Sequence, residues 1–206
     1  MFIVIEGIEG SGKSTLAAGI AERLEVEGHA VVVTREPGGT PLGDAVREIF
    51  LNRKIEISAL AESFLVNAAR VQHVGEVVRA ALEDGRIVLC DRFIDSTLAY
   101  QGYGRGVDLA ALRDMCATAA DGIEADLVLL LDLPVSAART RLREREMAAD
   151  RIESESDDFH ERVRRGFLEL AAASARHVVL DGTKMPSHVL HESLIAIRKR
   201  LGVPIT

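Results

Sequence analysis

The stretch from residue 2 to residue 27 constrains the fold of this chain more than any other. It opens with a short apolar run, Phe-Ile-Val-Ile, which predicts a buried strand. Leu16, Ile20 and Leu24 then recur at helical spacing and predict a helix with one apolar face. The residues between the two elements fit the phosphate-binding pattern G-x-x-x-x-G-K-[ST] and are predicted to hold a nucleoside triphosphate: Gly7, Ile8, Glu9, Gly10, Ser11, Gly12, Lys13, Ser14 and Thr15.

The residue types of this loop suit phosphate binding. Glycines let the backbone curl so that successive N–H groups point at phosphate oxygens, and the helix that follows adds its positive N-terminus. Lys13 is predicted to reach the β- and γ-phosphates, and Ser14 to give its hydroxyl to Mg²⁺. Glu9 is a second candidate for the metal site, or else an exposed loop carboxylate. A plain glycine-rich turn would leave the positions of Lys13 and Ser14 unexplained.

Composition narrows the class of protein. The chain has 206 residues, 48% of them hydrophobic, which is enough for one globular domain with a full core. A net charge of −7 argues against broad nucleic-acid binding, because such binding calls for a basic face. No apolar run approaches the roughly 20 residues that span a bilayer, and no basic region of a signal peptide precedes the first strand. Cys90 and Cys116 lack metal-ligand spacing and do not suggest a disulfide framework, which favours a cytoplasmic location.

Apolar strands alternate with helical stretches along the rest of the chain. The strands are predicted at 2–5, 31–34, 87–90, 127–131 and 178–180. The helices are predicted at 42–51, 60–83, 94–101, 108–120, 135–147, 157–173 and 187–201. This alternation without hairpin signals predicts an α/β, P-loop NTPase-type three-layer fold, with a five-stranded parallel sheet covered by helices on both faces. We expect a single domain over residues 1–206.

The longest of these helices carries both apolar and charged positions of interest. Five of its apolar residues are predicted to form one stripe: Phe64, Ala68, Val71, Val78 and Leu82. Arg70 lies on the same face as Val66, away from that stripe. It is therefore either available to a ligand or an ordinary exposed cation.

The ends of the predicted strands gather the remaining candidate residues. Ligands of parallel sheets bind outside the carboxyl ends of the strands, which places residues 7–15, 35–40 and 91–92 around one crevice. Asp91 directly follows an apolar strand, where P-loop enzymes keep an acidic residue for Mg²⁺. The plain alternative is a solvated residue at a strand end. The adjacent Arg92 and the phosphate-binding loop favour the functional interpretation.

Five arginines crowd a short stretch of this acidic chain: Arg139, Arg141, Arg143, Arg145 and Arg151. Interleaved glutamates would also fit a charged helix face, the usual explanation of such a run. The alternative is a mobile lid over about 141–156, because phosphoryl transfer gains from cations near the transferring group and from exclusion of water. The phosphate-binding loop has no arginine among its variable positions, which favours the lid.

Several stretches together resemble the bacterial thymidylate kinase family over essentially the whole chain. The most specific matches are Thr-Arg-Glu-Pro-Gly-Gly-Thr at 34–40, Ala-Ala-Arg at 68–70, Asp-Arg at 91–92, Asp-Ser-Thr at 95–97, Ala-Tyr-Gln-Gly at 99–102 and, in the lid, Asp-Arg-Ile-Glu at 150–153. The resemblance implies an enzyme that transfers the γ-phosphate of ATP to dTMP, giving dTDP, with Mg²⁺ as cofactor. It also implies a homodimer whose partners are ATP and dTMP, without nucleic acid or membrane.

The resemblance assigns roles to residues at matching positions. Arg92 would hold the phosphate of dTMP, and Tyr100 would pack beneath the deoxyribose and crowd out a ribose 2′-hydroxyl. Arg70 would hydrogen-bond the thymine base, in a pocket lined by Thr97 and Gln101. The acceptor phosphate and its metal environment would be faced by Arg35, Glu36 and Pro37.

The family divides by whether its catalytic arginine lies in the P-loop or in the lid, and this chain resembles the lid class. The candidates, first choice first, are Arg145, Arg143, Arg151 and Arg141. One position departs from the family pattern, because Val66 stands where the family has a phenylalanine stacked on the thymine ring. Phe64 lies about 200° around the helix and cannot substitute. Since stacking of a base on an aromatic ring is worth on the order of 1–3 kcal/mol, Val66 predicts weaker or less selective dTMP binding.

The implied reaction is an in-line transfer that needs no side-chain nucleophile, because the acceptor is already an anionic phosphate oxygen. Catalysis would come from positioning and from charge neutralisation by Lys13, Mg²⁺, Arg92 and the lid arginines. One alternative is a kinase for another nucleoside monophosphate, which the change at Val66 leaves open. Another is a P-loop switch or ATPase that signals through a partner, although the Asn-Lys-x-Asp guanine motif typical of a GTPase does not occur.

Overall fold

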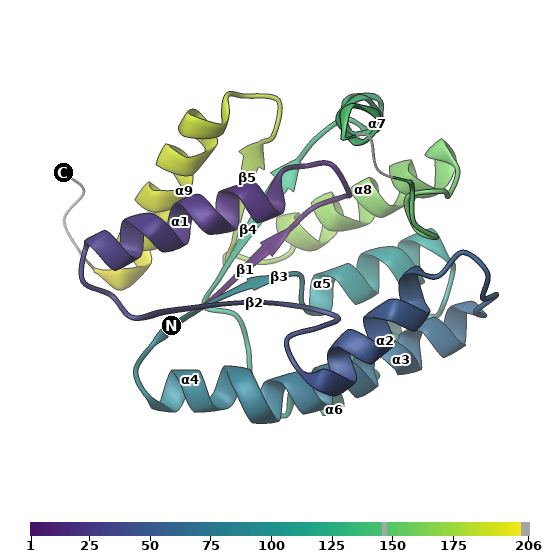
Figure 1. Cartoon of the computed structure of the whole chain (residues 1–206), viewed down its shortest axis with the longest axis horizontal. Coiled ribbons are helices and arrows are strands. Elements are labelled where there is room, and N and C mark those ends of the chain that lie inside the picture. The colour runs from purple at the N-terminus through teal and green to yellow at the C-terminus, as the bar shows by residue number, and fades with distance from the viewer. Residues whose placement is uncertain (146–147, 203–206) are drawn as a thin grey trace.

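The computed structural model describes residues 1–145 and 148–202. Its strands (Figure 1) are β1 (Phe2–Glu6), β2 (Val31–Arg35), β3 (Ile87–Asp91), β4 (Leu127–Asp132) and β5 (His177–Asp181). Its helical elements are α1 (Lys13–Val26), α2 (Pro41–Leu51), α3 (Ala59–His73), η1 (Val74–Val78), α4 (Arg79–Glu83), α5 (Ile94–Thr97), η2 (Leu98–Gly104), α6 (Leu109–Ala120), α7 (Val135–Glu144), α8 (Asp157–Ala172) and α9 (Pro186–Leu201). The strands pair in parallel in the order β2-β3-β1-β4-β5. The predicted five-stranded parallel sheet is confirmed.

Helices cover both faces of this sheet (Figure 1). On one face lie α1 and α9, where Ile20 and Leu24 of α1 pack against strand residues such as Ile5. On the other face, Val4 of the same strand packs with Val78 of η1. Because alternate residues of each central strand enter two different cores, the strands are apolar throughout, as is typical of a doubly covered parallel sheet.

The long helix predicted at 60–83 is present, but it consists of α3, η1 and α4 in succession, and η1 is π-helical. A π-helical turn is wider than an α-helical one, so it rotates the residues that follow relative to those before it. The prediction of one continuous apolar stripe is therefore wrong. Val78 is fully buried, whereas Phe64 and Val71 are each 56% exposed. The buried face of α3 instead carries Val66 and Arg70.

Two further findings concern the cysteines and the helices. Cys90 and Cys116 are both buried and free, so neither takes part in a disulfide. In the part of the chain that the structure describes, no helix combines the length and the apolar character needed to cross a membrane.

The sheet register brings the predicted site segments to one edge. Ile5 pairs with Asp91 across β1 and β3, and Arg35 pairs with Asp91 across β2 and β3. All three strands end at this level, so the loops that follow them emerge together. The crevice predicted at the carboxyl ends of the strands is thus formed by these loops.

Candidate active site

The loop between β1 and α1 wraps around the side chain of Lys13. Its ammonium group donates to the backbone oxygens of Gly7 and Ile8, at 2.9 Å each. Gly7 and Gly10 have positive φ, and a Cβ at either position would lie within 2.8 Å of a backbone oxygen, so only glycine fits. Burial, and next the nearby positive charge of Arg92, lower the pKa of Lys13 to about 8. Phosphate oxygens placed beside it would favour its charged form.

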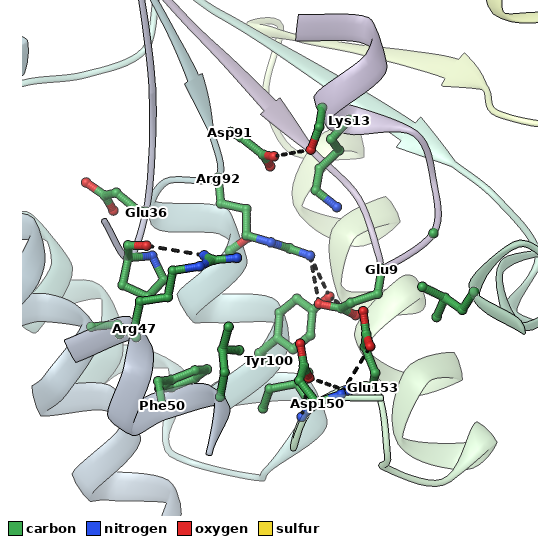
Figure 2. A pocket seen from close by; sticks show the side chains of 18 of the residues that line it. Glu9, Lys13, Glu36, Arg47, Phe50, Asp91, Arg92, Tyr100, Asp150 and Glu153 are labelled. Carbon is green, nitrogen blue, oxygen red and sulfur yellow. Dashed lines mark hydrogen bonds and ion pairs between the residues drawn. The ribbon is translucent and has the colours of Figure 1, made fainter. Parts of the chain in front are cut away.

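Asp91 lies beside Lys13 (Figure 2) and contacts Ser14, the residue that follows Lys13. The hydroxyl of Ser14 donates to Asp91 Oδ2 at 3.3 Å. Asp91 Oδ1 is buried and has no hydrogen-bond partner among the described residues. Within residues 1–145 and 148–202, no three or more His, Cys, Asp or Glu side chains form a group that could hold a metal by themselves. The hydroxyl of Ser14 and the carboxylate oxygen Oδ1 of Asp91 are donors that suit a hard cation such as Mg²⁺, which takes oxygen ligands and completes its shell with water and phosphate oxygens.

Arg92 joins the phosphate-binding loop to the other end of the site (Figure 2). Its guanidinium donates to Glu9 Oε1 at 2.8 Å and to Ser96 Oγ at 2.9 Å, and its Cζ lies 5.0 Å from the centroid of the Tyr100 ring. The hydroxyl of Tyr100 donates to the second oxygen of Glu9 at 2.6 Å. Both oxygens of Glu9 are therefore engaged in orienting Arg92 and Tyr100. Glu9 is not an isolated loop carboxylate.

A second carboxylate, Glu6, holds the segment around Arg92. The backbone of Arg92 has a φ of 75°, which side chains other than glycine rarely adopt. Glu6 accepts hydrogen bonds from the N–H of Phe93 at 2.9 Å, and from the N–H and hydroxyl of Ser96 at 3.2 and 2.6 Å. Burial, and next the Asp95 carboxylate, raise the pKa of Glu6 to about 7. No sequence motif marks Glu6, because it only ends an apolar strand.

The far end of the site is built around Arg70. This side chain is 1% exposed, so it is not an exposed helix cation. Its Nε donates to Glu36 Oε2 at 2.8 Å, and its Nη2 donates to Thr97 Oγ1 at 2.9 Å. Glu36 is held from its other side by His73 Nδ1 at 2.9 Å. Gln101 is also buried, and its side-chain amide donates to the carboxylate of Glu62 on α3 at 2.9 Å.

These groups surround a cavity of about 600 Å³. The predicted site residues that line it are Glu9, Gly10, Gly12, Lys13, Ser14, Thr15, Glu36, Pro37, Val66, Arg70, Asp91, Arg92, Thr97, Tyr100, Gln101, Arg141 and Arg145. The predicted site residues outside its lining are Gly7, Ile8, Ser11, Arg35, Arg143 and Arg151. Segments far apart in the sequence thus come together as predicted, with a few side chains directed elsewhere.

Arg35 and Arg151 are two of the side chains that are directed elsewhere. Arg35 lies 3.7 Å from the exposed carboxylate of Asp44. Arg151 donates to the backbone oxygen of Phe50 at 2.8 Å and also to the carboxylate of Glu62. Both arginines lie within a matching motif, but neither lines the cavity.

The arginines of the predicted lid differ in their contacts. Arg141 donates to the backbone oxygens of Ser11 and Gly182, at 3.4 and 2.8 Å. Arg145 pairs with Glu153 at 2.5 Å, and the Arg145 side chain is 47% exposed. Arg143 is exposed and outside the cavity lining. Residues 146–147, which fall within the predicted lid, lie outside the described residues.

Among the cavity residues that the sequence did not reveal as site residues are Arg47 and Phe50, both from α2. Arg47 donates to the backbone oxygen of Pro37 at 3.2 Å, and its side chain enters the cavity near Arg92 (Figure 2). Phe50 reaches the same cavity one helical turn later. No motif marks either residue, because the side of α2 that faces the cavity is decided by packing against α3.

Comparisons with known proteins agree with this geometry. The family model described as thymidylate kinase matches residues 5–193. The thymidylate kinase of Desulfovibrio desulfuricans is 48% identical over 98% of this chain and 96% of its own length. That of Deinococcus radiodurans is 48% identical over 97% of each chain. The crystal structure of thymidylate kinase from Ehrlichia chaffeensis superposes with a TM-score of 0.79 at 32% identity, over 96% of this chain and 98% of that one. The chain belongs to the thymidylate kinase family.

Proposed function

We propose that this protein transfers the γ-phosphate of ATP to dTMP inside the cavity described above. The observation that carries this proposal is the continuity of the cavity. Lys13 and Ser14 lie at one end, Arg70 and Thr97 at the other, and Arg92 between them. This order suits a triphosphate, an acceptor phosphate and an acceptor base arranged for in-line transfer.

At the triphosphate end, backbone N–H groups of residues 7–15 and the Lys13 ammonium would hold the β- and γ-phosphates. Mg²⁺ would be held by Ser14 and Asp91, whose buried Oδ1 has no other partner among the described residues. When bound there, the ion supplies charge neutralisation for the phosphate oxygens. Glu9 would orient Arg92 toward the phosphates by accepting its hydrogen bond.

At the acceptor end, Arg92 would hold the phosphate of dTMP. Arg47 lines the cavity from α2 and would place a second positive charge near the same phosphate. Arg70, Thr97 and Gln101 would contact the base, with Tyr100 beneath the deoxyribose. From the lid, Arg145 and Arg141 would approach the transferring phosphoryl group, where developing charge needs cations that water does not screen.

The test of this function is ADP release from Mg-ATP with dTMP, dUMP, dCMP, dGMP and AMP supplied separately. We expect release that depends strongly on dTMP and that stops when EDTA removes the metal. A preference for another monophosphate would make the protein a kinase for that acceptor. Equal release with every acceptor, or without any, would identify a nucleotide hydrolase instead.

We also propose that the protein is a cytoplasmic homodimer that joins through α3. Leu60, Phe64 and Val71 form an exposed apolar stripe on that helix, from 51 to 56% exposed. Exposed apolar side chains of this size on one helix face mark an interaction surface rather than a solvated one. The two buried free cysteines fit a reducing compartment.

Phe64→Glu is expected to convert this dimer into monomers, because it places a charge in the middle of the apolar stripe. Light scattering coupled to size exclusion should show the mass falling from two chains to one. Val26→Glu is the matched control, since Val26 is also exposed but lies on α1, on the other side of the sheet. An unchanged mass for Phe64→Glu would rule out this surface as the interface.

A further inference from the structure

Three aromatic rings of the described residues line the cavity, and two of them pack against other aromatic rings. Phe93 packs edge-on against Phe2, with ring centroids 5.0 Å apart, and lies beneath the guanidinium of Arg70. Tyr100 lies beneath Arg92 and packs against the rings of α8, while its hydroxyl is held by Glu9. Each of these two rings is thus held both by a guanidinium and by at least one other aromatic ring.

The third ring, Phe50, is placed differently. It lies near the C-terminal end of α2 and reaches into the cavity below Arg47 (Figure 2). Phe50 and Val66 belong to one hydrophobic cluster and line the same cavity, so this aromatic ring and this aliphatic side chain share the wall of the acceptor end. An aromatic ring at that wall is available to a planar base.

Arg151 holds the ring of Phe50 in place. Its Cζ lies 5.0 Å from the ring centroid, while its Nε and backbone N–H donate to the backbone oxygens of Phe50 and Leu51. The same guanidinium is anchored by Glu62, which is fully buried. A cation over one face of a ring leaves the opposite face for stacking and restricts the rotation of the ring.

We propose that Phe50 is the residue on which the acceptor base stacks, and that it thereby sets the affinity for dTMP. The inference rests on the proposed function and names the base contact within it. It also replaces the expectation of weaker or less selective dTMP binding that was drawn from Val66. Phe50 on α2 would supply the aromatic contact that Val66 on α3 does not. Arg151 then acts as a positioning residue for the base pocket, which explains why it faces Phe50 rather than the triphosphate end.

The first test is Phe50→Leu, which keeps an apolar side chain of similar size but removes the aromatic face. We expect the KM for dTMP to rise about ten-fold, with kcat and the KM for ATP nearly unchanged. Ile49→Leu is the matched control, because Ile49 is the neighbouring residue, partly exposed and outside the cavity. Val66→Phe should recover dTMP affinity in the Phe50→Leu background and add little in the natural one.

A second test measures the binding of dTMP directly, without catalysis. The chain contains no tryptophan, so Phe50→Trp introduces a single fluorophore at the proposed stacking position. Titration with dTMP should quench its emission, whereas 2-deoxyribose 5-phosphate, which lacks a base, should not. Ile49→Trp should respond to neither.

The outcomes separate this inference from the proposed function. If the natural protein does not phosphorylate dTMP, the proposed function fails. If it does, while Phe50→Leu leaves the KM for dTMP unchanged or dTMP leaves the emission of an active Phe50→Trp unchanged, the base stacks elsewhere and the assignment of Phe50 is wrong.

Discussion

Lys13→Ala is expected to lower kcat about a thousand-fold, while the KM for dTMP changes only a few-fold. The ammonium group is buried at the triphosphate end, where its charge acts on phosphate oxygens with little screening by water. Two of its three N–H donors already bond to backbone oxygens of the loop, so the group is oriented before nucleotide arrives. Steady-state kinetics with each substrate varied separately gives both parameters.

The control for this variant is Lys199→Ala, which removes the same charge from an exposed position on α9. It should leave kcat unchanged. A thermal unfolding curve for Lys13→Ala shows whether the loop still folds, since the variant also loses two hydrogen bonds. Comparable losses in kcat and in dTMP affinity would contradict a role confined to the triphosphate.

Arg145→Ala is expected to lower kcat by about two to three orders of magnitude, again with a smaller effect on dTMP binding. Arg145 follows α7, lines the cavity and pairs with Glu153. The Arg145 side chain is 47% exposed, and without it the buried Glu153 still accepts a hydrogen bond from the backbone N–H of Asp150. A thermal unfolding curve for Arg145→Ala shows whether the variant folds as the natural protein does; if it does, a large effect on kcat arises in the transition state. Arg141→Ala, measured alongside, tests the second cavity-lining arginine of the lid.

Arg165→Ala is the matched control for both lid variants, because Arg165 is an exposed arginine of α8 whose nearest carboxylate is 4.0 Å away. Its kcat should equal that of the natural protein. A kcat for Arg145→Ala within two-fold of the natural value would remove Arg145 from the mechanism. A larger loss for Arg141→Ala than for Arg145→Ala would move the principal cation to Arg141.

The parts of the site that follow directly from local sequence could be predicted. The strand, glycine-rich turn and helix around Lys13 are specified by residues that are neighbours in the chain. The positions of Asp91 and Arg92 followed from the rule that the ends of parallel strands share one edge. Arg70, Thr97 and Gln101 came from motif resemblance, and the cavity contains all three.

The parts that depend on packing between distant segments could not be predicted. The π-helical turn at 74–78 rotates the end of the long helix relative to its beginning. Phe64 and Val71 therefore face outward, whereas Val78, predicted on the same stripe, is buried. Arg47 and Phe50 enter the cavity only because α2 packs on α3 with that side inward. Arg35 and Arg151 lie within specific motifs, yet their side chains approach the carboxylates of Asp44 and Glu62 and do not line the cavity.

The most direct test of the central claim follows the γ-phosphate itself. The protein is incubated with Mg-ATP labelled at the γ-phosphate and with unlabelled dTMP, and the products are separated. We expect the label to appear in dTDP, in equal amount to the ADP formed, and to stay in ATP when dTMP is omitted. Label released as inorganic phosphate at a rate independent of dTMP would contradict phosphoryl transfer to dTMP.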